Sequence, residues 1–231
     1  MRVLVTRPRQ DAQEIAVLLR AAGHAPVLAP LLDVNFHDGA ALALDDVQAI
    51  LATSANGVRA LARRSARRDI PVFAVGPQTA AAAQDAGFSQ IRNADGDALA
   101  LADATTRWAT PEKGALLHVS GGSGEGRLAD TLTQAGFTLR RAVLYEVTTR
   151  DHLPPEAAKA LAEGVIDAAL FFSPRSARIF RDCVSRENLA CDSVLAACIS
   201  AATAHALTPL RFAAVRIAAA PNQAALLACL N

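Results

Sequence analysis

The sequence is poor in lysine, in aromatic residues and in net charge, and each shortage excludes a class of protein. All but two of its 23 basic residues are arginines, and 22 acidic residues balance them to a net charge of +1. Such a chain has no basic surface for sequence-independent binding, so we expect no nucleic-acid partner. Aromatic residues make up 4% of the chain and 53 residues are alanine, which favours closely packed helices over large aromatic clusters.

Long hydrophobic runs, paired cysteines and clustered histidines are also missing. No stretch of about 18 strongly apolar residues is present, so we expect no membrane-spanning helix. The three apolar residues after Arg2 are too few for the core of a signal peptide. The four cysteines have no C-x-x-C spacing, so we expect core thiols in a reducing cytoplasm. None of the five histidines has metal-ligand spacing, so no metal site is predicted.

What the sequence does contain is a regular alternation of short apolar runs with alanine-rich helical patterns. Strands are predicted at residues 2–6, 47–53, 72–75, 115–119, 166–172, 194–199 and 213–217, with extended segments at 24–36 and 139–149. Helices are predicted at residues 11–22, 56–67, 77–86 and 126–135, after the strands at 166–172 and 194–199, and from residue 222 onward. This order predicts an α/β protein whose parallel sheets are covered by helices on both faces.

An internal repeat divides the chain into two similar halves. When the numbering is shifted by 113, Leu4 meets Leu117 and Gly23 meets Gly136, and later elements match in the same order with loops of unequal length. Coincidence is the alternative, because such units look alike in an alanine-rich chain. The ordered match favours duplication and predicts two similar lobes, each a parallel sheet flanked by helices. The extended segments near residues 33–39 and 146–154 are the candidate linkers.

The loops that follow the predicted strands share one chemistry. Serine, threonine, asparagine or glycine stands just before a helix at residues 53–56, 76–79, 120–123, 173–176 and 200–203. For any single loop, helix capping is explanation enough. Together, however, helix N-termini offer unbonded N–H groups and partial positive charge. The set therefore predicts a site for a ligand with several carboxylates or phosphates, without a basic surface.

Two further features are ambiguous. The glycine-rich segment 120–127 has glycines spaced as in a phosphate-binding loop, but Arg127 replaces the lysine that the motif needs, so an ordinary turn or a mobile loop is favoured. The pair Arg140 and Arg141 is interpreted as solvated surface. Tyr145, the only tyrosine, is either a common strand residue or a phenol that faces a cleft between the lobes and donates a proton.

Six short motifs, in this order and spacing, resemble those of the uroporphyrinogen-III synthase family over the whole chain. They are VLVTRP at 3–8, TSANGV at 53–58, AVGPQT at 74–79, LYEVT at 144–148, FFSPRS at 171–176 and ISAATA at 199–204. The resemblance implies that the lobes exchange halves: residues 1–35 and 150–231 form one lobe, and residues 36–149 form the other. One departure is Ser200, which stands where the family usually has glycine.

The resemblance also implies a function. The family is a cyclising lyase that closes hydroxymethylbilane, a linear tetrapyrrole with eight carboxylates, into uroporphyrinogen III, with inversion of ring D and loss of water. It uses no metal or cofactor, and we expect a cytoplasmic monomer. Tyr145 corresponds to the tyrosine that assists departure of the hydroxyl, and five residues match substrate-binding positions: Arg7, Ser54, Thr79, Ser173 and Thr203. The alternative is a two-lobed, non-catalytic binding or sensor module for an anionic small molecule, which would show no turnover.

Overall fold

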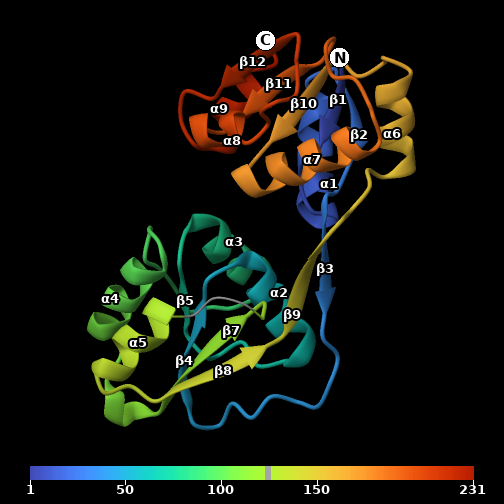
Figure 1. The fold of residues 1–231 in the computed structure, drawn as a ribbon. Helices are drawn as coiled ribbons and strands as arrows, with labels where there is room; N and C mark the ends of the chain where they lie inside the picture. The colour runs from blue at the N-terminus through green and yellow to red at the C-terminus, as the bar shows by residue number, and fades with distance from the viewer. Residues whose placement is uncertain (123–125) are drawn as a thin grey trace. The chain divides into compact units, whose positions relative to one another are not determined.

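The computed structural model describes residues 1–122 and 126–231, and the chain forms two compact units. Unit 1 consists of Met1–Asp33 and Thr148–Asn231, and unit 2 consists of Val34–Val147. The first unit is thus built from both ends of the chain and the second from its middle (Figure 1). Residues 123–125, which belong to the glycine-rich segment 120–127, lie outside the described residues.

Unit 1 contains a five-stranded sheet in the order β12-β11-β10-β1-β2, and every neighbouring pair is parallel. Its strands are β1 (Arg2–Val5), β2 (Ala25–Leu28), β10 (Ala168–Phe171), β11 (Leu195–Cys198) and β12 (Ala214–Ile217). Its helices are α1 (Arg9–Ala21), α6 (Pro155–Ala162), α7 (Pro174–Arg186), α8 (Ala201–His205) and α9 (Gln223–Ala228).

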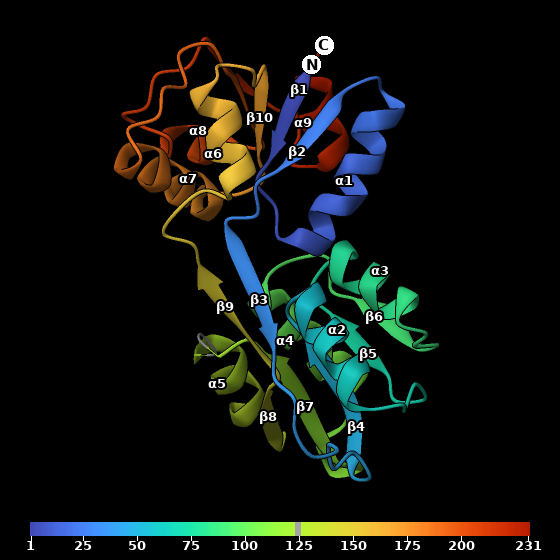
Figure 2. The same cartoon turned by 90° about the vertical axis from the view of Figure 1, so that its right-hand side faces the viewer.

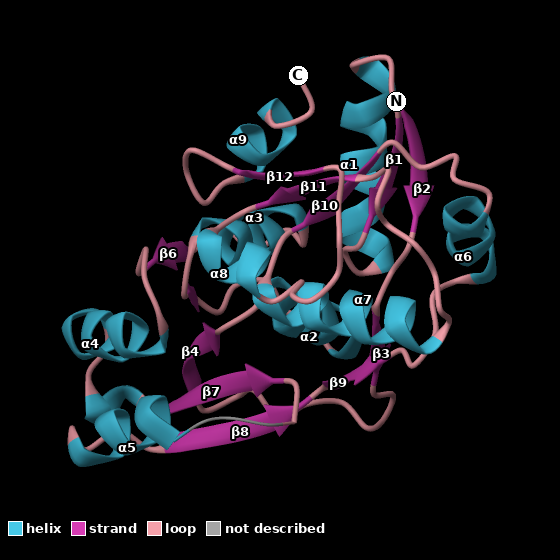
Figure 3. Ribbon diagram, turned by 45° about the horizontal axis from the view of Figure 1, so that its top comes forward, coloured by secondary structure: helices cyan, strands magenta, loops and turns pink. Residues whose placement is uncertain are grey.

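Helices cover both faces of this sheet, so its central strands are apolar on both sides. In β1, Leu4 packs in one cluster with Phe180 of α7, while Val3 and Val5 pack in another with Ile15 of α1. Figure 3 shows α1 and α9 on one side of the strands and α7 and α8 on the other. The two faces therefore form two separate hydrophobic layers.

The described part of unit 2 repeats this plan with the sheet order β6-β5-β4-β7-β8, again all parallel. Its strands are β4 (Val47–Ala52), β5 (Val72–Ala74), β6 (Ile91–Asn93), β7 (Ala115–Ser120) and β8 (Leu139–Val143). Its helices are α2 (Ala55–Arg64), α3 (Pro77–Asp85), α4 (Ala98–Trp108) and α5 (Gly126–Gln134), with a short 3-10 helix at Pro111–Lys113. Helices α2 and α3 share one apolar cluster and α4 and α5 the other (Figure 2).

Two strands carry the chain between the units: β3 (Leu32–Phe36) and β9 (Tyr145–Thr149) pair as a separate two-stranded sheet. The N–H of His37 donates to the carbonyl of Leu144 at 2.8 Å, and the N–H of Arg150 donates to the carbonyl of Leu31 at 3.0 Å. Residue numbers rise on one strand as they fall on the other, so the pair is antiparallel.

The predicted fold class is confirmed, because both units have parallel sheets flanked by helices. Several element boundaries differ from the prediction. The extended segment 139–149 is interrupted at Leu144, whose N–H donates to the carbonyl of Ser120 at 3.0 Å. The helix predicted to end at residue 67 ends at Arg64, whose guanidinium donates to the carbonyls of His37 and Ala40. Strand β6 and helices α4 and α6 were not predicted.

Candidate active site

The loops predicted to bind the ligand follow neighbouring strands in both units. In unit 1, Arg7 follows β1, Ser173 follows β10 and Thr203 lies on α8 just after β11, and these three strands are adjacent in the sheet. Because the strands are parallel, their carboxyl ends share one edge, which is where ligands bind in sheets of this type. In unit 2, Ser54 follows β4 and Thr79 lies on α3 just after the neighbouring β5.

Arg7 is a cation at the unit 1 edge, and its side chain is held by two contacts. One guanidinium nitrogen lies 2.9 Å from a carboxylate oxygen of Asp11, one turn into α1. The guanidinium carbon lies 4.9 Å from the ring centroid of Phe172, the residue before Ser173. The stacking places Arg7 against Phe172, the residue before Ser173, and favours one orientation of the guanidinium.

The hydroxyl groups of the unit 1 edge cap helices. The Oγ of Ser173 accepts from the N–H of Ser176 at 3.1 Å, which begins α7. The Oγ of Ser200 accepts from the N–H of Thr203 at 3.3 Å and lies 3.0 Å from its Oγ1. Thr203 itself is completely buried. At α8 the N–H groups offered to a ligand are therefore those of the exposed Ala201 and Ala202.

In unit 2 the structure brings Ser54 and Tyr145 together, although they are 91 residues apart in the chain. The two hydroxyl oxygens are 2.7 Å apart, and the Oγ of Ser54 also accepts from the N–H of Gly57 at 3.1 Å to cap α2. Tyr145 is only 7% exposed and packs in the apolar cluster of α2 and α3. Its phenol oxygen is thus fixed beside a helix N-terminus. Thr79, on α3, is 4% exposed.

A polar cluster that the sequence did not predict lies at the same edge of unit 2. The Nε2 of His118 on β7 lies 3.2 Å from the Oγ1 of Thr53, the residue before Ser54. The Nε of Arg141 on β8 donates to the Oγ of Ser120 at 3.0 Å, and its Nη2 donates to the carbonyl of Gly122 at 2.7 Å. From the sequence, Arg141 was interpreted as solvated surface. Nothing in the residues around it distinguishes it from Arg140.

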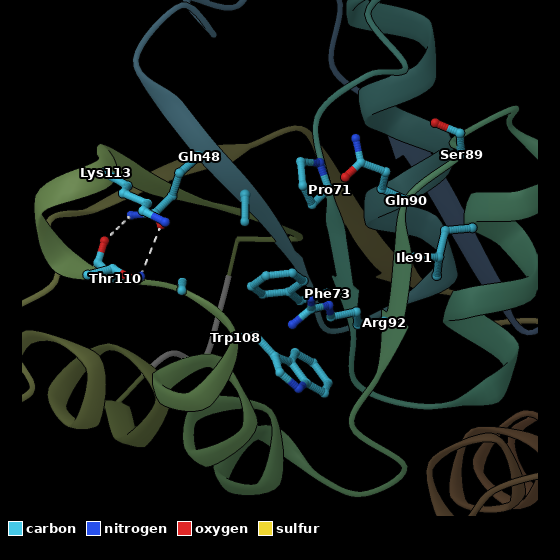
Figure 4. A pocket seen from close by; sticks show the side chains of 12 residues that line it. Gln48, Pro71, Phe73, Ser89, Gln90, Ile91, Arg92, Trp108, Thr110 and Lys113 are labelled. Carbon is cyan, nitrogen blue, oxygen red and sulfur yellow. Dashed lines mark hydrogen bonds between the residues drawn. The ribbon is translucent and has the colours of Figure 1, made fainter.

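A cavity of about 370 Å³ lies at the opposite edge of the unit 2 sheet, near the amino ends of β4, β5 and β6 (Figure 4). The guanidinium carbon of Arg92 lies 5.9 Å from the ring centroid of Phe73 and 5.7 Å from that of Trp108. The Nε2 of Gln48 donates to the carbonyl of Thr110 at 3.0 Å and ties two walls together. No predicted site residue lines this cavity, so it is distinct from the edge that carries Ser54 and Tyr145.

Residues 1–122 and 126–231 contain neither a cluster of metal-ligating side chains nor a membrane-spanning helix. No group of three or more histidine, cysteine, aspartate or glutamate residues in these ranges could hold a metal ion. No helix formed by them combines the length and apolarity needed to cross a membrane.

Comparison with known proteins gives one family and one fold. The family model described as uroporphyrinogen-III synthase HemD matches residues 13–228. The sequence of this chain is 19% identical to that of uroporphyrinogen-III synthetase from Helicobacter pylori 26695, whose crystal structure is known. The match covers 100% of this chain and 98% of that chain, and the TM-score is 0.65. A mutant uroporphyrinogen III synthase from the extremely thermophilic bacterium Thermus thermophilus is 18% identical, with 100% and 96% covered and a TM-score of 0.52. No curated protein matched the sequence.

Proposed function

This chain belongs to the uroporphyrinogen-III synthase family, and from that premise we propose how its residues carry the reaction. The chain is a cyclising lyase of tetrapyrrole biosynthesis, which closes hydroxymethylbilane into uroporphyrinogen III with inversion of ring D and loss of water. The observation that carries this function is the family match over residues 13–228. No finding favours the non-catalytic binding module.

The proposed substrate-binding residues hold the eight carboxylates of the tetrapyrrole. Arg7 supplies a charged, pre-oriented donor, and Ser54 and Ser173 open helices whose first N–H groups point to the sheet edge. Thr79 and Thr203 are buried, so their proposed contribution is to shape the loops whose backbone N–H groups bind. Binding through backbone groups at helix N-termini explains how a chain with a net charge of only +1 takes up a polyanion.

Tyr145 is the proposed catalytic residue. Its phenol donates a proton to the hydroxyl of the hydroxymethyl group; the carbon–oxygen bond breaks and water leaves, with the electron pair of the pyrrole nitrogen stabilising the carbocation. The substituted carbon of ring D then attacks this carbocation and forms a spiro intermediate. The bond from that carbon to the ring C methylene breaks, the methylene re-bonds to the free α-carbon of ring D, and the proton lost from that carbon returns to the Tyr145 phenolate. The 2.7 Å contact with Ser54 supports this role, because it fixes the position of the phenol oxygen.

Positioning provides the larger part of the proposed catalysis. The leaving step is already assisted by the pyrrole nitrogen, and closure without an enzyme gives the uninverted isomer. The protein must therefore fold the substrate so that the substituted carbon of ring D reacts first. Such ordering of reacting groups is a large source of rate enhancement, and general acid catalysis by Tyr145 adds to it.

The proposed working form is a monomer in the cytoplasm that binds no nucleic acid. The balanced charge of the chain supports the last point. All four cysteines are free, and Cys183, Cys191 and Cys198 are buried, which suits a reducing compartment.

The test of the proposed function is turnover with isomer analysis. The purified protein is incubated with enzymatically generated hydroxymethylbilane, and the products are oxidised and separated. We expect the type III isomer, whereas a parallel incubation without the protein gives the type I isomer. If the protein neither speeds consumption of hydroxymethylbilane nor changes the isomer, the chain is a binding module and the proposal is wrong.

A further inference from the structure

Gly121, directly after β7, lies against the ring of Tyr145 more closely than any other residue type allows. A Cβ atom built on Gly121 would lie 2.4 Å from Cε2, 2.5 Å from Cζ and 2.9 Å from the phenol oxygen of Tyr145. The backbone of Gly121 does not have a positive φ, so other residues could adopt its conformation. The space taken by the phenol is therefore the reason for glycine at this position. Gly122 differs, because its φ is +91° and a Cβ there would meet nothing.

Hydrogen bonds from the chain just before Tyr145 hold Gly121 on both sides. Arg141 donates to the Oγ of Ser120 and to the carbonyl of Gly122, at 3.0 and 2.7 Å. The N–H of Leu144 donates to the carbonyl of Ser120 at 3.0 Å. Gly121 is thus a fixed wall rather than a loop that could yield to the ring.

The far end of the phenol is fixed as well. Its oxygen lies 2.7 Å from the Oγ of Ser54, and its ring is buried in the apolar cluster of α2 and α3. An ordinary van der Waals contact to a Cβ begins at about 3.4 Å. A methyl group at position 121 would therefore push the ring by about 1 Å and strain or break the contact with Ser54.

We infer that Gly121 is a positioning residue: its missing side chain sets the place of the Tyr145 phenol oxygen, and Arg141 keeps its backbone there. The inference rests on the proposed role of Tyr145 and assigns a part to the described start of the glycine-rich segment. A displacement of this size in a reacting group lowers kcat by roughly 10–100-fold. KM changes less than kcat, because Ser54 is the one proposed carboxylate-binding residue for which a contact with the phenol is described.

The placement is tested without any assay of activity. Tyr145 is the only tyrosine, so protein labelled with [ζ-¹³C]tyrosine gives a single resonance from this phenol. We expect Gly121→Ala to shift that resonance. Gly126→Ala is the matched control, because a Cβ at Gly126, in the same segment, meets nothing within 4 Å. An unshifted resonance in Gly121→Ala would show that Gly121 does not place the ring.

Kinetics then test the consequence. Gly121→Ala should lower kcat by about 10–100-fold with a smaller change in KM, while Gly126→Ala keeps the wild-type values. In the background of Tyr145→Phe, Gly121→Ala should cause no further loss, because both changes remove the same interaction. A full additional loss in the double variant would contradict the inference. A shifted resonance with a wild-type kcat would instead contradict the proposed role of Tyr145.

A second variant keeps the test open if Gly121→Ala does not fold. Arg141→Gln removes the charged donor that holds Ser120 and Gly122 but adds no atoms beside Tyr145. We expect the same resonance to shift and kcat to fall, each by less than in Gly121→Ala. If Arg141→Gln leaves both at wild-type values, the inferred support of the Gly121 wall is wrong.

Discussion

The hydroxyl groups at the sheet edges do two things at once. Ser54 accepts an N–H of α2 and also contacts the phenol of Tyr145. Ser173 caps α7 beside the stacked pair of Arg7 and Phe172. A hydroxyl that caps a helix is held in one rotamer by the backbone it serves, so the same oxygen presents a constant position to a ligand. Structural and functional roles are therefore not alternatives at these residues.

Replacement of Tyr145 by phenylalanine tests the proposed acid directly. The ring remains, so the cluster around α2 and α3 stays packed and folding is retained. Loss of a general acid lowers kcat by about 10²–10⁴-fold. We expect this loss in single-turnover kinetics, with the type III isomer still formed, because the shape of the site determines inversion.

The matched variant is Ser54→Ala, which keeps the phenol but removes its partner and the cap of α2. It should fall between wild type and Tyr145→Phe in rate. A wild-type rate constant for Tyr145→Phe would remove Tyr145 from the mechanism and leave positioning alone.

At the scale of elements, several helices begin with an N-cap residue whose side-chain oxygen accepts a backbone N–H. Ser54, Asp97, Ser173, Ser200 and Asn222 all accept N–H groups of the next turn. Only some of these helices begin at loops that we assign to substrate. Removing a cap from a helix of each kind should therefore lower the free energy of unfolding in both cases but lower activity in only one.

We predict that Ser173→Ala and Asp97→Ala lower the free energy of unfolding by a similar amount, about 0.5–2 kcal/mol each. Ser173→Ala should also lower kcat/KM, because its loop lies beside Arg7. Asp97→Ala should leave kcat/KM unchanged, since both hydrogen bonds described for Asp97 come from N–H groups of α4 and Asp97 is not one of the proposed binding residues. Denaturant unfolding and steady-state kinetics of the two variants measure both effects. An equal loss of kcat/KM in both variants would mean that stability alone explains it.

At the scale of the whole molecule, each unit carries its own natural probe. Trp108, the only tryptophan, packs edge-on against Phe73 in unit 2, with the ring centroids 5.1 Å apart. All four cysteines are in unit 1. Burial raises the pKa of Cys183 and Cys191 to about 11 and that of Cys198 to about 12. These three thiols are therefore protonated at neutral pH and unreactive until unit 1 opens.

We predict that the units unfold in separate transitions, because each has its own pair of apolar clusters and the chain passes from one unit to the other within β3 and β9. Trp108 fluorescence and thiol labelling, followed in the same denaturant series, should give curves with different midpoints. The half-buried Cys229 serves as the control and should be labelled first. Coincident curves from the two probes would show a single cooperative unit.

The sequence by itself determined the fold class and the location of the candidate site residues on the chain. Strand and helix periods, capping residues and glycine stops are local signals, and they predicted most elements to within a few residues. Since parallel strands end at one edge, the same signals placed Ser54 and Thr79 on a shared edge, whereas Arg7 and its place beside Ser173 were expected only from the family resemblance. Helices α4 and α6 were missed although Asp97 caps the first and Pro155 begins the second.

Only the tertiary structure decided which of these residues meet. The contact between Ser54 and Tyr145 joins the loop after β4 to the first residue of β9, which belongs to a different sheet, and no local pattern encodes such a contact. The same holds for Gly121, because its glycine is visible in the sequence but the ring that requires it lies in another strand. Contacts between distant residues arise from the packing of whole elements, so the chemistry at this edge is specified by the fold rather than by any segment of the chain.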